Sequence, residues 1–273
     1  MAKSDIRMPA VAGKFYPAGE KKLREEIASF VKGAAQKTNA IACVLPHAGY
    51  MYSGAVAGAT VASLEVKEKI ILLGPNHTGY GVPFSIMTEG VWQTPLGKLK
   101  IDSDFAAKLL QRSEILEEDS EAHLDEHCLE VELPFLQYFK NDFEFVPIVI
   151  ASQAIVNLKK LGEEIASQII ESGISCKTLI ITSSDMTHYE PQADAETKDR
   201  AAIEAMLELN EDKLANRVTS MNISMCGYAP VVSAIVAAKI LGAKKARLIK
   251  YQTSGDTTGD TESVVGYAGV IIE

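Results

Sequence analysis

The sequence predicts a single α/β domain, a sandwich in which helices cover a largely parallel or mixed central sheet. Short apolar runs, typical of strands buried on both faces, alternate along the chain with amphipathic stretches of about 10–15 residues. This alternation indicates βα units around a parallel sheet. No repeat, low-complexity tract or long Pro/Gly/Ser linker interrupts residues 1–273, which favours one domain over two.

The first part of the chain alternates helix, strand, helix, strand. Apolar residues at helical spacing predict a helix over 21–31, and an apolar run predicts a strand over 41–45. Residues 53–64 are rich in Ala, Gly and Val, which predicts a helix packed closely on the sheet. A second apolar run predicts a strand over 70–73, and residues 84–102 alternate loosely around glycine and proline, typical of a hairpin excursion.

The second part continues the same pattern. Helical spacing predicts helices over residues 104–112, 158–170, 195–209 and 230–241. Apolar runs predict strands over residues 145–150, 179–182, 247–252 and 264–272. Residues 127–139 are also predicted to be helical, with an interruption near Pro134.

Composition excludes several classes of protein. The formal net charge of −9, from 27 basic and 36 acidic residues, argues against nucleic acid as the main partner. No apolar run approaches the roughly 20 residues of a membrane helix. The first seven residues lack the apolar stretch of a secretory signal, so we expect a cytoplasmic protein with no membrane partner.

Three histidines follow three predicted strands. His47 comes after the first apolar run, His77 after the second and His188 after the strand at 179–182. Ligands of open α/β sheets bind beyond the carboxyl ends of parallel strands, so these histidines are predicted to face one crevice. Imidazoles gathered in one place usually bind a metal or transfer protons. The alternative is three independent loop histidines.

Cys226 is the candidate third ligand. No two of the four cysteines have the CxxC spacing, which excludes a zinc ribbon or a thioredoxin motif. Cys226 lies shortly before the helix predicted at Pro230, where the helix dipole is expected to favour its thiolate. The alternative is a buried structural thiol, which also describes Cys43 in its apolar strand.

Asp185 and His188 share one short segment. An aspartate three residues before a histidine can orient the imidazole or bind a metal itself, and the alternative is a turn cap. Since His47 and His77 already offer two imidazoles, we expect His188 to act as an acid or base. Tyr50, Tyr52 and Asn76 are expected to line the same pocket, or else, for the tyrosines, to pack on the sheet edge.

The segment His123-Leu124-Asp125-Glu126-His127 fits the HxxEH pattern of inverted zinc peptidases. On a helix the two histidines would share one face, with Glu126 as the base. The pattern stands at the start of a predicted helix rather than within it. We therefore favour His127 pointing into the crevice and His123 on the surface or rim.

Five ordered motifs together resemble the Memo family, and within it the protein B branch of the AmmeMemoRadiSam system. They are Pro46-His47-Ala48-Gly49-Tyr50 with Ser53-Gly54, Leu73-Gly74-Pro75-Asn76-His77, Glu126-His127-Cys128-Leu129-Glu130 with Leu133-Pro134-Phe135, Ser184-Asp185-Met186-Thr187-His188-Tyr189, and Cys226-Gly227. The resemblance extends from about Arg7 to the C-terminus.

The resemblance implies the fold of class III extradiol ring-cleaving dioxygenases, which bind non-haem Fe(II) through two histidines and a carboxylate. His47 and His77 match the metal histidines, and Cys226 takes the place of the carboxylate. His188 matches the acid/base histidine, with Asp185 and His127 lining the pocket. Because the third ligand differs, ring cleavage itself is not implied.

Two functions follow as hypotheses. The first is a non-haem iron oxidoreductase, with copper or zinc as alternative metals, that takes a small-molecule or peptide ligand in its cleft. The resemblance links it to a radical-SAM enzyme and an AMMECR-type protein as functional partners. The second is a non-catalytic binding module that uses the same cleft for a phosphorylated or carboxylated peptide. Metal content distinguishes the two.

Overall fold

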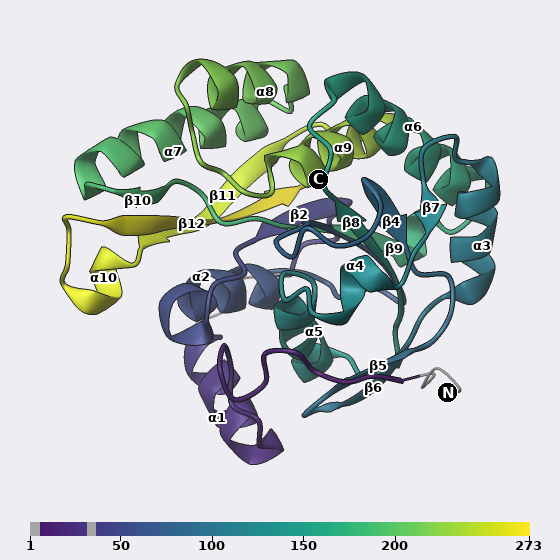
Figure 1. Cartoon of the computed structure of the whole chain (residues 1–273), viewed down its shortest axis with the longest axis horizontal. Helices are drawn as coiled ribbons and strands as arrows, with labels where there is room; N and C mark the ends of the chain where they lie inside the picture. Colours follow the sequence, from purple (N-terminus) through teal and green to yellow (C-terminus); the bar gives the residue numbers. More distant parts are fainter. Residues whose placement is uncertain (1–5, 32–36) are drawn as a thin grey trace.

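Nine strands form one mixed sheet among the residues that the computed structural model describes, 6–31 and 37–273 (Figure 1). In chain order they are β2 (Ala42–Leu45), β3 (Lys69–Pro75), β4 (Phe84–Ile86), β7 (Glu117–Glu118), β8 (Glu144–Ile150), β9 (Thr178–Ser183), β10 (His188–Glu190), β11 (Ala246–Thr253) and β12 (Val264–Ile272). Their order in space is β10–β12–β2–β9–β3–β8–β4–β7, with β11 paired to the free side of β12.

The four strands at the centre are parallel. β2 pairs with β9, β9 with β3 and β3 with β8, all in the same direction, whereas β12 and β4 run antiparallel to their neighbours β2 and β8. The sheet is therefore mixed around a parallel centre, as the sequence predicts. In this register Leu45 lies beside Ser183 and Leu73 beside Thr182. The loops after β2, β3 and β9 consequently leave the sheet at one edge.

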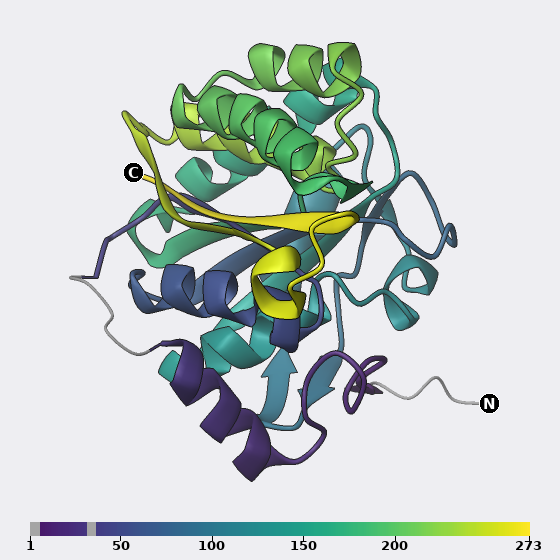
Figure 2. The same cartoon turned by 90° about the vertical axis from the view of Figure 1, so that its left-hand side faces the viewer.

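Helices cover both faces of the sheet, giving three layers (Figure 2). On one face lie α1 (Glu20–Phe30), α2 (Tyr50–Ala62) and α5 (Leu133–Phe139). On the other lie α3 (Ser103–Arg112), α6 (Ile155–Glu171), α7 (Gln192–Leu207), α8 (Glu211–Ser220) and α9 (Tyr228–Ile240). Short helical turns are α4 (Glu121–Leu124), η1 (Glu130–Glu132), η2 (Ser175–Lys177) and α10 (Gly255–Thr258). None of the described helices is long and apolar enough to span a bilayer.

The small residues of α2 let it approach the sheet closely, as predicted. A Cβ atom placed on Gly269 of β12 would lie only 1.9 Å from the Thr60 hydroxyl of α2. Thr60 itself donates that hydroxyl to the Val56 carbonyl one turn earlier, so this polar side chain is satisfied within its own helix. The contact holds α2 closely against β12.

Three regions differ from the predicted elements. Residues 84–102 supply β4 to the main sheet before forming the hairpin of β5 (Val91–Thr94) and β6 (Gly97–Lys100). Pro134 does not interrupt a helix, because α5 begins at Leu133 and a proline in the first turn leaves no required N–H unmade. Helix α8 was not predicted, although Asn210 caps it by accepting the N–H of Lys213.

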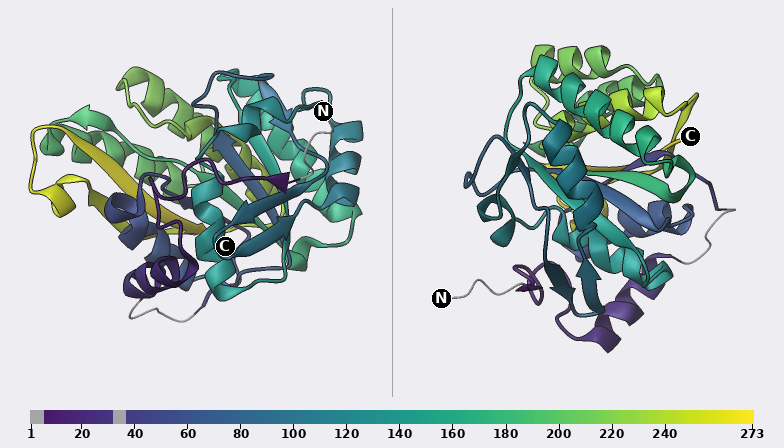
Figure 3. Two further views of the ribbon diagram at one scale, coloured as in Figure 1. Left: turned by 60° about the horizontal axis from the view of Figure 1, so that its bottom comes forward. Right: turned by 90° about the vertical axis from the view of Figure 1, so that its right-hand side faces the viewer.

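The N-terminal strand β1 (Ile6–Arg7) pairs with β5, and together with β6 they form a small second sheet (Figure 3, left). The Arg7 guanidinium donates to the carbonyls of His123 and Glu126, each at 2.6 Å, and forms a buried ion pair with Glu130, also at 2.6 Å. It also lies 4.1 Å from the ring centre of Trp92. Arg7 therefore fixes the backbone that carries Glu126 and His127.

Candidate metal centre

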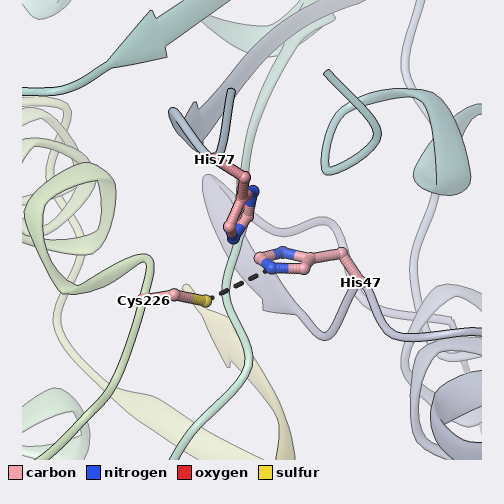
Figure 4. A group of neighbouring side chains, drawn as sticks. All are labelled: His47, His77 and Cys226. Carbon is pink, nitrogen blue, oxygen red and sulfur yellow. Dashed lines mark hydrogen bonds between the residues drawn. The ribbon is translucent and has the colours of Figure 1, made fainter. Parts of the chain in front are cut away.

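Two histidines and a cysteine from three separate loops point toward one another (Figure 4). His47 follows β2, His77 follows β3 and Cys226 comes just before α9. Their ligand atoms all lie within 4.8 Å of one another, and the Cys226 Sγ is 3.2 Å from the His47 Nε2. The predicted gathering of these three residues at the sheet edge is confirmed, and their donors suit a transition metal.

His47 is held from two sides, through its ring and through its backbone. Its ring Nδ1 lies 2.9 Å from the Ser183 hydroxyl, and its backbone N–H donates to the Asp185 carboxylate at 2.8 Å. Burial, together with the neighbouring His77 and His127, holds the pKa of His47 well below its usual value. The imidazole is therefore neutral, and its Nε2 faces the Cys226 thiol.

Glu126 orients two imidazoles at once. Its Oε1 lies 2.9 Å from the His77 Nδ1 and 3.2 Å from the His127 Nδ1, and its Oε2 accepts the His77 backbone N–H at 2.5 Å. Burial alone would raise the pKa of Glu126, but the hydrogen bonds from His127 and His77 outweigh it, so the pKa falls well below its usual value. A charged carboxylate only accepts, so both Nδ1 atoms carry hydrogen, and Nε2 is the nitrogen of each ring that remains to bind a metal or a proton.

His77, Glu126 and His127 are also close enough to share a metal ion. However, the Glu126 Oε1 already accepts the backbone N–H groups of His127 at 2.9 Å and Cys128 at 3.0 Å. An oxygen so fully engaged is a weaker donor than the free nitrogens and sulfur of the first group. We assign Glu126 as the outer partner of the His47–His77–Cys226 group, the usual role of a carboxylate behind a metal-binding histidine.

The zinc-peptidase pattern is not realised. Helix α4 ends at Leu124, before Glu126, so His123 and His127 do not share a helix face. The expectation of His123 on the surface or rim is wrong, because its side chain is wholly buried with its ring 6.1 Å from that of Trp92. The bond from Arg7 to the His123 carbonyl pulls this segment inward. His127, as expected, faces the site.

His127, and not His188, completes the cluster of rings. Its ring centre lies 5.5 Å from that of His47 and 4.6 Å from that of His77. His188 lies on the edge strand β10, where its ring is 5.8 Å from Tyr189. It remains within electrostatic reach of the site, because in its protonated form it lowers the pKa of both His47 and Asp185. The shared crevice of strand-end histidines is thus confirmed most directly for His47 and His77.

The surroundings of His188 and Asp185 bear on where each side chain holds a proton. The backbone N–H of His188 donates to the Ser224 hydroxyl at 2.7 Å, and its Nδ1 lies 2.9 Å from the Ser224 carbonyl. A carbonyl only accepts, so the His188 Nδ1 carries hydrogen, and Nε2 is the nitrogen that can gain or release a proton. Asp185 is buried, which raises its pKa despite the hydrogen bond from His47.

The Cys226 thiol does not have the lowered pKa expected from the helix dipole. Burial raises the pKa of Cys226, and the Asp185 carboxylate adds to the rise. Cys226 precedes Gly227, the residue before the first turn of α9, and desolvation outweighs any effect of the dipole there. A bound cation reverses this balance, because coordination favours the thiolate and releases its proton.

The three predicted pocket-lining residues have different places. Tyr50 lies in the core, donating its hydroxyl to the Val131 carbonyl with its ring 4.4 Å from Phe135, so the pocket prediction is wrong for it. The cause is that α2 begins at Tyr50, which turns this ring toward α5. Asn76 hydrogen-bonds to Thr78, Gly79 and Tyr80 within its own loop, and its place in the pocket stays a prediction. Tyr52 is half-buried.

Sequence reasoning missed the outer partners of the site. Ser183, which contacts the His47 ring, is the last residue of β9, and the sequence pattern predicts Glu126 only as the base of a zinc peptidase. A polar residue ending a buried parallel strand was an available signal for Ser183. No comparable signal existed for Glu126, since its role depends on a turn that only the folded chain displays.

Replacing Glu126 with glutamine is expected to weaken metal binding by about 10–100-fold, the usual effect of losing an outer partner. The glutamine amide keeps the shape of the side chain but has only one accepting oxygen, whereas N–H groups of His77 and His127 donate to both oxygens of Glu126. Its NH₂ group would face one of these donors and repel it. Anaerobic titration with Co(II) measures the affinity. Glu121→Gln, an exposed change on α4, is the control, and equal affinity for both variants would contradict the assignment.

Comparison with known proteins agrees with the full-length resemblance. The family model described as Memo-like protein matches residues 7–271. MEMO1 family proteins of Methanopyrus kandleri and Methanocaldococcus jannaschii are each 42% identical, covering 97% and 98% of this chain and 98% and 99% of their own. A crystal structure of an uncharacterized protein from Escherichia coli K12 has a similar fold, with a TM-score of 0.58 at 13% identity over 85% of this chain and 99% of that one.

Proposed function

This chain belongs to the Memo-like protein family, and from that premise we propose that it is a metal-dependent redox protein whose centre is held by His47, His77 and Cys226. The observation that carries the proposal is the convergence of three ligand atoms within 4.8 Å, each from a different loop. Their outer partners Ser183 and Glu126 fix the two imidazoles from behind. Such support is typical of metal centres and has no evident purpose in a simple peptide cleft.

The donor set favours Fe(II), with copper and then zinc as the alternatives. Two neutral imidazoles and one thiolate carry a formal charge of −1, the same as two histidines and a carboxylate. The sulfur is a softer donor than a carboxylate oxygen, which widens the range of metals toward copper and zinc. Three protein ligands leave positions open for a substrate, and a bound redox metal would supply electron transfer or oxygen activation there.

Around this centre the chain provides groups that handle protons. His188 presents a free Nε2 and His127 another, since the Nδ1 atom of each is held by a hydrogen-bond acceptor. Asp185 anchors the His47 backbone and lies buried beside the site. We assign His188 as the acid/base group and Asp185 and His127 as pocket residues. The links to a radical-SAM enzyme and an AMMECR-type protein belong to this proposal and rest on the family resemblance.

The test is the metal content of protein purified anaerobically from its native host. We expect near-stoichiometric iron. After the metal is stripped, Fe(II) at a hundred times its Kd is expected to stabilise the fold by about 2.7 kcal/mol, seen as a rise in Tm that a chelator reverses. Protein that carries no metal and shows no shift with Fe(II), Cu(I) or Zn(II) would instead support the non-catalytic peptide-binding module.

A further inference from the structure

A buried carboxyl group, that of Glu132, is linked to the His47 ring through the hydroxyl of Ser183. The link reaches Nδ1 of the ring, whereas Cys226 contacts Nε2. Glu132 of η1 is 0% exposed, and its Oε1 lies 2.8 Å from the Ser183 hydroxyl. That hydroxyl in turn lies 2.9 Å from the His47 Nδ1. Glu132, Ser183 and His47 therefore form a chain of hydrogen bonds that ends at the metal-binding ring.

Counting hydrogens at Ser183 fixes the direction of each bond. The hydroxyl has one hydrogen and two lone pairs. Its shortest contact, at 2.7 Å, is to the Cys128 carbonyl, which only accepts, so the hydrogen goes there. The Glu132 Oε1 and the His47 Nδ1 must then both donate to Ser183. An ionised Glu132 could only accept, so the Ser183 hydrogen would have to point at Glu132. The Ser183 hydroxyl oxygen and the Cys128 carbonyl oxygen would then lie 2.7 Å apart with no hydrogen between them.

The surroundings of Glu132 agree with a neutral acid. Its second oxygen has no hydrogen-bond partner among the described residues, and burial raises its pKa well above the usual value. Glu130, two residues earlier and equally buried, is the opposite case. Its carboxylate receives the Arg7 guanidinium, the Tyr16 hydroxyl and two backbone N–H groups. One short segment thus holds a charged carboxylate and an uncharged one.

We propose that Glu132 is a positioning residue which, as a neutral acid acting through Ser183, fixes hydrogen on the Nδ1 of His47 and so presents its Nε2 to the metal. The inference deepens the proposed function and rests on it for the metal readout. The position of the hydrogen on His47 is measured in metal-free protein, so the inference can fail or stand separately from the metal assignment.

The first experiment is ¹⁵N NMR of the imidazole nitrogens in metal-free protein. Wild type and Glu132→Gln are both expected to show hydrogen on Nδ1 of His47, because an amide N–H can replace the acid O–H as the donor to Ser183. Ser183→Ala is expected to lose this preference, because nothing then accepts from Nδ1. A wild-type His47 with its hydrogen on Nε2 would overturn the proposal.

The second experiment compares affinities for Co(II), titrated anaerobically. Glu132→Ala is expected to bind about 10–100-fold more weakly than wild type, as for other outer partners. Glu132→Gln is expected to stay within a few-fold of wild type. The matched control is Glu130→Gln, which breaks the ion pair with Arg7 and is expected to lower Tm much more than Glu132→Gln does. Equal losses of Tm, or a Gln variant as metal-poor as the Ala variant, would overturn the proposal.

Discussion

Replacing Cys226 with alanine is expected to empty the metal centre while leaving the fold intact. The sulfur supplies the single negative charge of the donor set, so without it two neutral imidazoles remain to hold a dication. The loss should therefore exceed the about 10–100-fold expected for an outer partner. His47→Ala and His77→Ala are expected to lower metal content similarly, and elemental analysis of protein purified anaerobically measures all three.

Two controls separate coordination from general damage. Cys43→Ala removes the same atoms from a buried position inside β2, away from the ligand group, and is expected to retain metal. His123→Ala removes an imidazole that packs beside Trp92, so it is expected to cost stability but not metal. If Cys226→Ala kept its full metal content and His123→Ala lost its metal, the result would support the zinc-peptidase arrangement instead.

The parts of the site that depend on the sheet could be predicted from the sequence. The apolar runs that became β2 and β3 are buried along nearly their whole length, which makes them unmistakable as central parallel strands. Both strands belong to the parallel centre of the sheet, with β9 between them, so their carboxyl ends lie at one edge and bring His47 and His77 together. Cys226 was found because it stands before a recognisable helix.

The parts that depend on turns and on contacts between distant segments could not be predicted. Tyr50 was misplaced because α2 starts three residues before the helical pattern becomes visible, which turns the ring into the core. The state of Cys226 was misjudged because the sequence shows the nearby helix but not the burial that opposes its dipole. Glu126 and Glu132 were missed as outer partners because their roles are set by atoms far away in the chain.

His188→Ala is expected to keep the metal and the fold but to lose most of any turnover. Its Nδ1 is committed to the Ser224 carbonyl, so the ring presents one free nitrogen, Nε2, as a proton acceptor. The side chain is partly exposed and lies outside the group of three ligands, so its removal leaves the donor set unchanged. A positioned imidazole of this kind typically contributes about 10²–10⁴-fold in rate, which sets the size of the expected loss.

The metal content of His188→Ala can be measured before any substrate is known. We expect it to equal that of wild type, and Ser224→Ala serves as the control, because the carbonyl that holds Nδ1 belongs to the backbone and survives that change. Once a substrate is found, Ser224→Ala should retain far more turnover than His188→Ala. A His188→Ala protein as metal-poor as His47→Ala would make His188 a ligand, and the free Nε2 would then be a coordinating nitrogen rather than a base.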